Sequence, residues 1–128
     1  MITKILIVED ETRISSLLKL YLERESFIVD VAEDGEVGSK MALTNEYDLF
    51  VLDVLLPNKN GYIILEEIRA VKNTPVVMLS AQNEKFDQKK RDGLGATDFI
   101  PKPFSFTDTV QRIKEIIEES RYKNRAVQ

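Results

Sequence analysis

The stretch "LFVLDVLLPNKNG", residues 49 to 61, places one aspartate, Asp53, within a run of apolar residues that ends at Pro57 and Gly61. A short apolar run bounded by turn residues is typical of a strand buried on both faces, as in a parallel sheet. A carboxylate there needs a reason, because burying an uncompensated charge is costly. The stretch therefore predicts a buried strand whose end delivers Asp53 to a polar crevice.

Other apolar runs of strand length lie on both sides of this stretch, and segments with helical patterns separate them. The runs are Ile5–Val8, Phe27–Val31, Leu49–Leu52, Pro75–Leu79 and Asp98–Ile100. Between the first two, apolar residues recur at the three-and-four spacing of an amphipathic helix. The last helix is expected to begin at the capping pattern Ser105–Asp108. The alternation predicts an α/β fold, a doubly wound five-stranded parallel sheet with helices on both faces.

The composition limits the chemistry that the chain can perform. At 128 residues, of which 43% are hydrophobic, the chain has the size of one globular domain. It contains no Cys and no His, which excludes disulfides, thiolate metal sites and imidazole catalysis. The net charge of −4 gives no reason to expect direct binding of nucleic acid. The apolar runs are too short to span a bilayer and no signal peptide is recognisable, which predicts a cytoplasmic protein without membrane contact.

The residues that follow the strands suggest a site. In a doubly wound sheet the functional crevice lies beyond the carboxyl ends of the strands. The residues expected there are Glu9, Asp10, Glu11, Asp53, Ser80, Ala81, Lys102 and Pro103. Taken singly, each has an ordinary structural role as a cap, a turn residue or a solvated charge. Their joint occurrence favours a site, because clustered carboxylates need a cation, and oxygen ligands without His or Cys suit Mg²⁺.

Four segments carry a resemblance to a known family. "ILIVEDE", "YDLFVLDVLLPNKNG", "PVVMLSA" and "GATDFIPKPFS" resemble, in order and at the same spacing, the response-regulator receiver family across residues 3–120. The resemblance implies a phosphoacceptor domain of two-component signalling, with a flavodoxin-like sheet ordered 2-1-3-4-5. It places the receiver domain in residues 1–121 and a C-terminal tail, or the start of a linker, in residues 122–128. Such a domain is not an enzyme, beyond catalysing its own phosphorylation and dephosphorylation.

The resemblance also implies a metal-dependent phosphoacceptor site. Asp53 would be phosphorylated to 4-aspartylphosphate by a sensor histidine kinase or a phosphotransfer protein. Mg²⁺ would be the cofactor, bound by Asp10, Asp53 and the backbone carbonyl of Leu55, and by Glu9 through water. A carboxylate can accept a phosphoryl group as a mixed anhydride once charge on the transferred oxygens is neutralised.

A second set of residues is implied to bind the phosphoryl group and report its arrival. Lys102 would supply positive charge, and a cis peptide between Lys102 and Pro103 would direct its ammonium into the crevice. Ser80 would be the switch hydroxyl, with the backbone N–H of Ala81 beside it. Phe99 matches the switch aromatic, expected to move inward with Ser80. An aromatic residue in an apolar strand is more often simply part of the core.

A homodimer through the face made by helix 4, strand 5 and helix 5 is a further possibility of the family. Asp98, Arg112 and residues 89–91 resemble the charge pairs by which the receivers of winged-helix transcription regulators dimerise. The alternative is that these charges form a solvated face. The fourth helix, in "KKRDGLGATDF", is expected to be short, because it contains two glycines and few large apolar residues.

Three other functions compete with this interpretation. A haloacid-dehalogenase-type phosphatase also uses an aspartate at a strand end, but it needs a second Asp where this chain has Leu55. A flavodoxin-like flavin carrier needs a phosphate loop after the first strand, where acidic residues here would repel phosphate. A pseudo-receiver that acts as a protein-binding module would normally have lost Asp53, Lys102 or one of the acidic pair, and all are present.

Overall fold

A computed structural model describes residues 2–81 and 95–126. These residues form a five-stranded parallel sheet in the order β2-β1-β3-β4-β5, so the predicted fold and strand order are confirmed. The strands are β1 (Lys4–Val8), β2 (Ile28–Ala32), β3 (Leu49–Asp53), β4 (Val76–Ala81) and β5 (Asp98–Lys102). The helices are α1 (Thr12–Glu23), α2 (Gly35–Thr44), α3 (Gly61–Val71) and α5 (Phe106–Ala126). The expected fourth helix lies outside the described residues.

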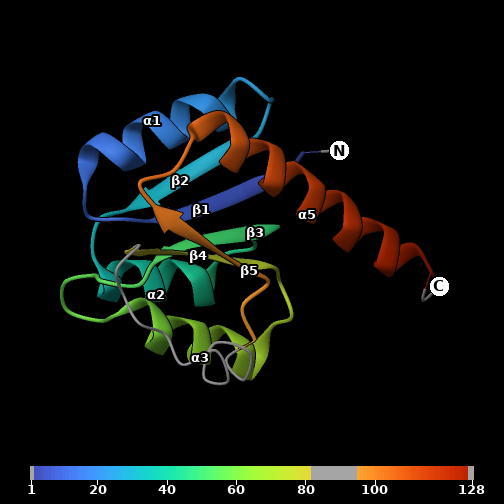
Figure 1. Cartoon of the computed structure of the whole chain (residues 1–128). Coiled ribbons are helices and arrows are strands. Elements are labelled where there is room, and N and C mark those ends of the chain that lie inside the picture. The colour runs from blue at the N-terminus through green and yellow to red at the C-terminus, as the bar shows by residue number, and fades with distance from the viewer. Residues whose placement is uncertain (1, 82–94, 127–128) are drawn as a thin grey trace.

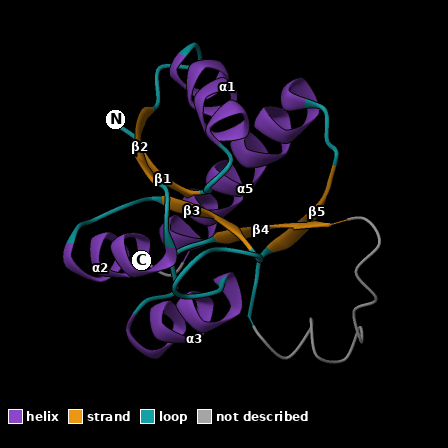
Figure 2. Ribbon diagram, turned by 90° about the vertical axis from the view of Figure 1, so that its left-hand side faces the viewer, coloured by secondary structure: helices purple, strands orange, loops and turns teal. Residues whose placement is uncertain are grey.

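The helices form one layer on each face of the sheet (Figures 1 and 2). α1 and α5 cover one face, and α2 and α3 cover the other. The central strand β3 is buried along its whole length, with Asp53 as its last residue. Since both faces are covered, β3 is apolar throughout rather than alternating, which explains the run that precedes Asp53.

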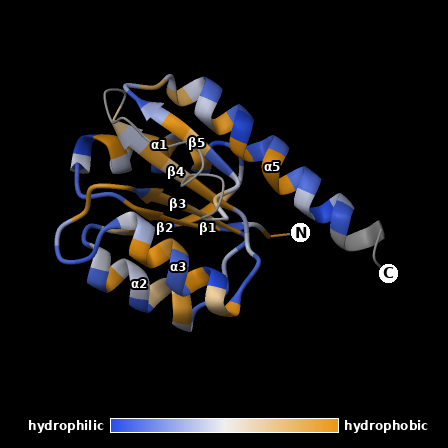
Figure 3. Ribbon diagram, turned by 60° about the horizontal axis from the view of Figure 1, so that its bottom comes forward, coloured by the Kyte–Doolittle hydropathy of each residue, from blue (hydrophilic) through white to orange (hydrophobic). Residues whose placement is uncertain are grey.

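Two hydrophobic cores hold the layers together. Successive residues of a strand point to opposite faces, so Ile5 and Ile7 contact one core while Leu6 and Val8 contact the other. In Figure 3 the central strands β1 and β3 are coloured as hydrophobic, as expected for strands that are covered on both faces. The site residues therefore extend from a rigid, closely packed support.

Side-chain caps fix the points where three helices begin beyond the strand ends. Asp34 accepts a hydrogen bond from the Val37 N–H in α2, and Asn60 accepts one from the Ile63 N–H in α3. The hydroxyl oxygen of Ser105 accepts a bond of 3.1 Å from the backbone N–H of Asp108, as its capping pattern predicts.

α5 continues to Ala126, through most of the segment 122–128 that was expected to be a C-terminal tail or the start of a linker. In Figure 1 its last turns extend past the sheet. Among the helices of the described residues, none is long and apolar enough to cross a membrane.

Candidate functional site

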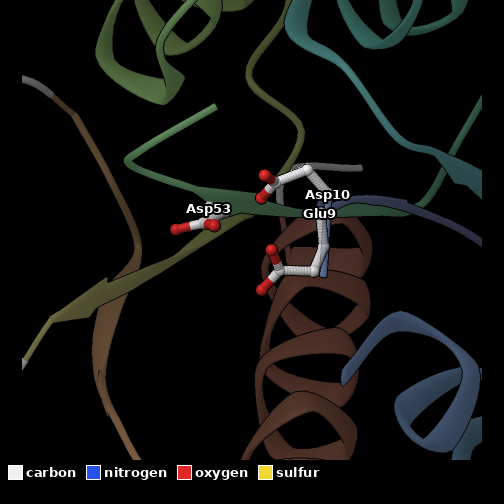
Figure 4. Close-up of side chains that lie close together, drawn as sticks. All are labelled: Glu9, Asp10 and Asp53. Atoms are coloured by element: carbon white, nitrogen blue, oxygen red, sulfur yellow. The ribbon is translucent and has the colours of Figure 1, made fainter. Parts of the chain in front are cut away.

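Three carboxylates meet at the carboxyl ends of β1 and β3. Glu9 and Asp10 follow β1, Asp53 ends β3, and one oxygen from each lies within 4.8 Å of the others. Figure 4 shows the three side chains turned toward one region. Glu9 is fully buried and Asp53 is 4% exposed, whereas Asp10 is exposed. The pairing of Val8 with Leu52 in the sheet brings the two strand ends side by side.

The backbone around Asp53 is held on both sides. The Val54 N–H donates to the carbonyl of Leu79 in β4, and the Gly61 N–H donates to the carbonyl of Val54, each at 2.9 Å. A Cβ on Gly61 would lie 2.2 Å from the carbonyl oxygen of Asp53, so a side chain has no room there. The turn from β3 to α3 thus closes directly against Asp53 and fixes its position.

The ammonium of Lys102 enters this cluster from the end of β5. Its Nζ lies 2.6 Å from Oε1 of Glu9, 3.0 Å from Oδ2 of Asp53 and 3.3 Å from Oε1 of Glu11. The Lys102–Pro103 peptide bond is cis. Lys102 pairs in register with Ala81 of β4, which places it at the same end of the sheet as the carboxylates.

The electrostatics of the cluster leave negative charge in excess. Burial and the nearby Asp53 carboxylate raise the pKa of Glu9 from 4.5 to about 8, although Lys102 opposes this shift. Burial alone would lower the pKa of Lys102, but its contacts with Glu9 and Asp53 outweigh that effect and raise the pKa. One ammonium is therefore shared by three acidic side chains, those of Glu9, Glu11 and Asp53.

The residues present fit a hard divalent cation. Oε1 of Glu9 is buried and accepts no hydrogen bond of good geometry from the described residues, so its close approach to Lys102 is an ion pair. A buried carboxylate oxygen without a hydrogen bond, beside two further carboxylates, can bind a metal ion or a water molecule that is bound to one. The acidic cluster is thus consistent with the Mg²⁺ site that the sequence resemblance implies.

The other predicted residues lie on β4, β5 and the turn after β3. Ser80 is 6% exposed and pairs in register with Pro101. Phe99 is half-buried and packs against the core beneath α2 and α3. Leu55 is 64% exposed, and its N–H donates to Oδ1 of Asp53 at 3.3 Å. Ala81 is half-buried at the end of β4.

On the predicted dimer face, the described charges pair within the chain. Nε of Arg112 in α5 donates to Oδ2 of Asp98 in β5 at 2.8 Å. Residues 89–91, which were expected to take part in the same face, lie outside the described residues.

Sequence reasoning missed one contributor to the site and one ion pair that lies outside the crevice. Glu11 was expected at the crevice but was given no role, although its carboxylate contacts Lys102. The ion pair between Lys59 and Glu67, beneath the turn after β3, was not foreseen, because nothing in the sequence pairs a loop lysine with one helical glutamate.

The chain is similar to many response regulators. The family model described as "Response regulator receiver domain" matches residues 5–114. The chain is 40% identical to "Response regulator ArlR" of Staphylococcus saprophyticus over 122 residues, covering 95% of this chain and 56% of the relative. It is 40% identical to "Transcriptional regulatory protein ResD" of Bacillus subtilis over 118 residues, covering 92% and 49%. The chain thus spans about half the length of the curated relatives it matches.

Solved structures give the same result. The receiver domain of the Francisella response regulator 1452 superposes with a TM-score of 0.85 at 28% identity, covering 92% of this chain and 98% of that one. A CheY-like receiver domain protein from Methanospirillum hungatei JF-1 has a TM-score of 0.88 at 26% identity, covering 96% and 99%. With the fold, the acidic cluster and the family match in agreement, the chain belongs to the response-regulator receiver family of two-component signalling, and it is not a conventional enzyme.

Proposed function

We propose that this chain accepts a phosphoryl group on Asp53 from a sensor histidine kinase or a phosphotransfer protein. The observation that carries the proposal is the 3.0 Å contact between Nζ of Lys102 and Oδ2 of Asp53, at the centre of the acidic cluster. Asp53 is only 4% exposed, its backbone is fixed, and each of its two carboxylate oxygens has a contact, with the Leu55 N–H or with Lys102, so its carboxylate has a defined direction of attack.

In the proposed transfer, a carboxylate oxygen of Asp53 attacks the donor phosphorus. The bond from phosphorus to the donor histidine nitrogen breaks, its electron pair stays on that nitrogen, and an acyl phosphate forms. Lys102 neutralises charge on the transferred oxygens. Asp10, Asp53 and the backbone carbonyl of Leu55 would hold Mg²⁺, with Glu9 holding it through water. The ion would supply the remaining charge neutralisation.

Arrival of the phosphoryl group is proposed to act through Ser80, the N–H of Ala81 and Phe99. The hydroxyl of Ser80 would bond a phosphoryl oxygen, and Phe99 would follow into the vacated space. Relatives that span about twice the length of this chain include proteins named as transcriptional regulators, which supports a transcriptional output. The face that includes β5 and α5 would then pair two copies of the chain.

Intact-mass spectrometry with acetyl phosphate as donor tests the proposal. We expect wild type to gain the mass of one phosphoryl group when Mg²⁺ is present and none when EDTA is added. Asp53→Asn should remain unlabelled. Asp48→Asn is the matched control, because Asp48 precedes the same strand and its carboxylate accepts a hydrogen bond from the Lys4 N–H at the opposite end. Equal labelling of wild type and Asp53→Asn would remove Asp53 from this role, and no labelling of wild type would favour a pseudo-receiver.

A further inference from the structure

A polar cluster outside the crevice joins the turn after β3 to both helices on that face. Nζ of Lys59 lies 3.1 and 3.0 Å from the two carboxylate oxygens of Glu67 in α3, and 3.3 Å from Oγ of Ser39 in α2. The Ser39 hydroxyl donates to Oε1 of Glu67 at 2.9 Å, and Ser39 is only 3% exposed. These mutual contacts fix the lysine between two helices, because each polar group of the cluster has a partner in it.

The backbone beside Lys59 is held just as closely. The N–H groups of Lys59 and Gly35 both donate to the carbonyl of Pro57, at 2.8 and 3.0 Å. Asn58, between Pro57 and Lys59, has φ of 70°, a conformation that costs energy in most residues and persists where its surroundings impose it. A Cβ on Gly35 would lie 1.8 Å from the carbonyl oxygen of Lys59. The start of α2 is therefore packed directly against this turn.

The turn that Lys59 holds is the one that leaves Asp53. Residues 54–60 connect Asp53 to α3. The hydrogen bond from the Gly61 N–H to the Val54 carbonyl closes this turn next to Asp53. Leu55 lies between Val54 and Lys59, which are both held by contacts. Its own side chain is 64% exposed, so packing of that side chain does little to hold Leu55 in place. The Leu55 N–H donates to Oδ1 of Asp53 at 3.3 Å and Leu56 packs against the core, so the contacts of Lys59 at the far end of the turn are a further constraint on the direction of the Leu55 carbonyl.

We propose that Lys59 is a positioning residue: through Glu67 and Ser39 it fixes the turn after β3, and so sets the Mg²⁺ affinity of the acidic cluster and the rate at which Asp53 is phosphorylated. The proposal rests on the proposed function, because it assumes that the Leu55 carbonyl binds the metal. Outer-shell contacts are known to orient metal ligands in this way, and their loss weakens metal binding about tenfold or more.

Lys72 offers a matched control within the same pair of helices. Its Nζ donates to the carbonyls of Ala42 and Asn45, at 2.8 and 2.9 Å. Like Lys59, it joins the α2 region to the α3 region, but at the end of α3, which is the opposite end from Asp53. A substitution there removes a lysine bridge between the same helices without touching the turn.

The test compares Lys59→Ala with Lys72→Ala by NMR and by mass spectrometry. In the metal-free protein, Lys59→Ala should speed hydrogen exchange of the amides of Gly35 and residue 59, which bond to Pro57. It should also raise the Mg²⁺ dissociation constant about tenfold and slow labelling by acetyl phosphate at limiting Mg²⁺. Lys72→Ala should leave all three unchanged. The double variant Lys59→Glu with Glu67→Lys should recover most of the lost Mg²⁺ affinity, since it restores the ion pair with the two charges exchanged.

Two results would overturn the inference. One is an unchanged Mg²⁺ dissociation constant in Lys59→Ala. The other is an equal loss of Mg²⁺ affinity in Lys72→Ala, which would indicate that the effect comes from the general packing of the two helices. Failure of the proposed function would look different. In that case wild type itself would bind no Mg²⁺ or take no label, whereas the amide exchange of Gly35 would still respond to Lys59→Ala.

Discussion

Glu9 is the most deeply buried carboxylate of the crevice. It is fully buried, and the one ammonium beside it is shared with Asp53 and Glu11. Burial and the nearby Asp53 carboxylate therefore raise its pKa to about 8. In the metal-free protein a proton on Glu9 relieves the same repulsion that a bound cation would relieve.

The first prediction concerns the pH dependence of stability without metal. Because the pKa of Glu9 is raised in the folded state, from 4.5 to about 8, the stabilising contribution of its proton is complete below pH 4.5 and lost as the pH rises through about 8. The melting temperature in EDTA should fall between about pH 5 and about pH 8. The chain contains no histidine, so few other side chains titrate in this range.

Glu9→Gln should flatten this fall, because glutamine carries no titratable proton. Glu46→Gln replaces an exposed glutamate and is the control. Its melting temperature should depend on pH as that of wild type does. Melting curves at several pH values measure both. A Glu9→Gln variant with the full wild-type slope would contradict the assignment of the effect to Glu9.

The sequence predicts site residues well where one side chain ends a strand. Asp10, Asp53 and Lys102 each follow an apolar run, and parallel strands must bring their ends to one edge of the sheet. Lys59 and Glu67 have no such signal. Their contact depends on the path of the turn around Asn58 and on where α2 packs against it, which are properties of the packed structure rather than of a local pattern.

Among the elements, the corner from β3 to α3 is the one most closely tied to the chemistry. Gly61 begins α3, and its Cα faces the carbonyl of Asp53 at a distance that leaves no room for a Cβ. Backbone atoms, unlike the end of a flexible side chain, cannot move aside at low cost. The glycine is therefore required by a close approach between two elements.

The second prediction is that Gly61→Ala lowers the free energy of unfolding by about 1–3 kcal/mol, the usual cost of forcing extra atoms into a packed site. It should also slow phosphorylation of Asp53, because relief of the clash shifts the Asp53 backbone. Denaturant unfolding and intact mass after acetyl phosphate treatment measure the two effects.

Gly38→Ala is the matched comparison for this corner. Its Cβ would lie 2.5 Å from Cγ1 of Val8, so it also overpacks a helix against the sheet, but it does not touch Asp53. We expect a loss of stability with phosphorylation little changed. Equal phosphorylation of Gly61→Ala and wild type would show that the corner does not position the acceptor.

Element boundaries were predictable where a hydrophobic pattern or a cap marks them. The strands were placed correctly to within two residues at each end, and Ser105 marks the start of α5. The length of α5 was not predicted. Among the α5 side chains whose burial the structure describes, up to residue 123, the last fully buried one is Ile117, and the sequence that follows carries no periodic apolar signal, although the helix continues to Ala126.

At the scale of the whole molecule, β4 and β5 connect the crevice to one edge of the sheet, where β5 is the last strand. Ser80 is opposite Pro101 in this pair of strands, and Phe99 is opposite the fully buried Met78. Ser80 therefore lies at the crevice end of the same strand pair in which Phe99 is held. Because parallel strands share their backbone hydrogen bonds, a displacement at Ser80 can be passed to β5.

The last prediction is that this strand pair transmits phosphorylation through the Ser80 hydroxyl. Mg²⁺ with beryllofluoride, which imitates a phosphoryl group, should shift the amide signals of Asp98 and Phe99 as well as those of the crevice, by biasing a pre-existing equilibrium. Ser80→Ala should remove the distant shifts and keep Mg²⁺ binding. Ser15→Ala is the control, since that buried hydroxyl donates to the Thr12 carbonyl within α1. If the amide signals around Phe99 shifted equally in Ser80→Ala, the Ser80 hydroxyl would not couple the crevice to β5. Phe99 would then be only a core residue.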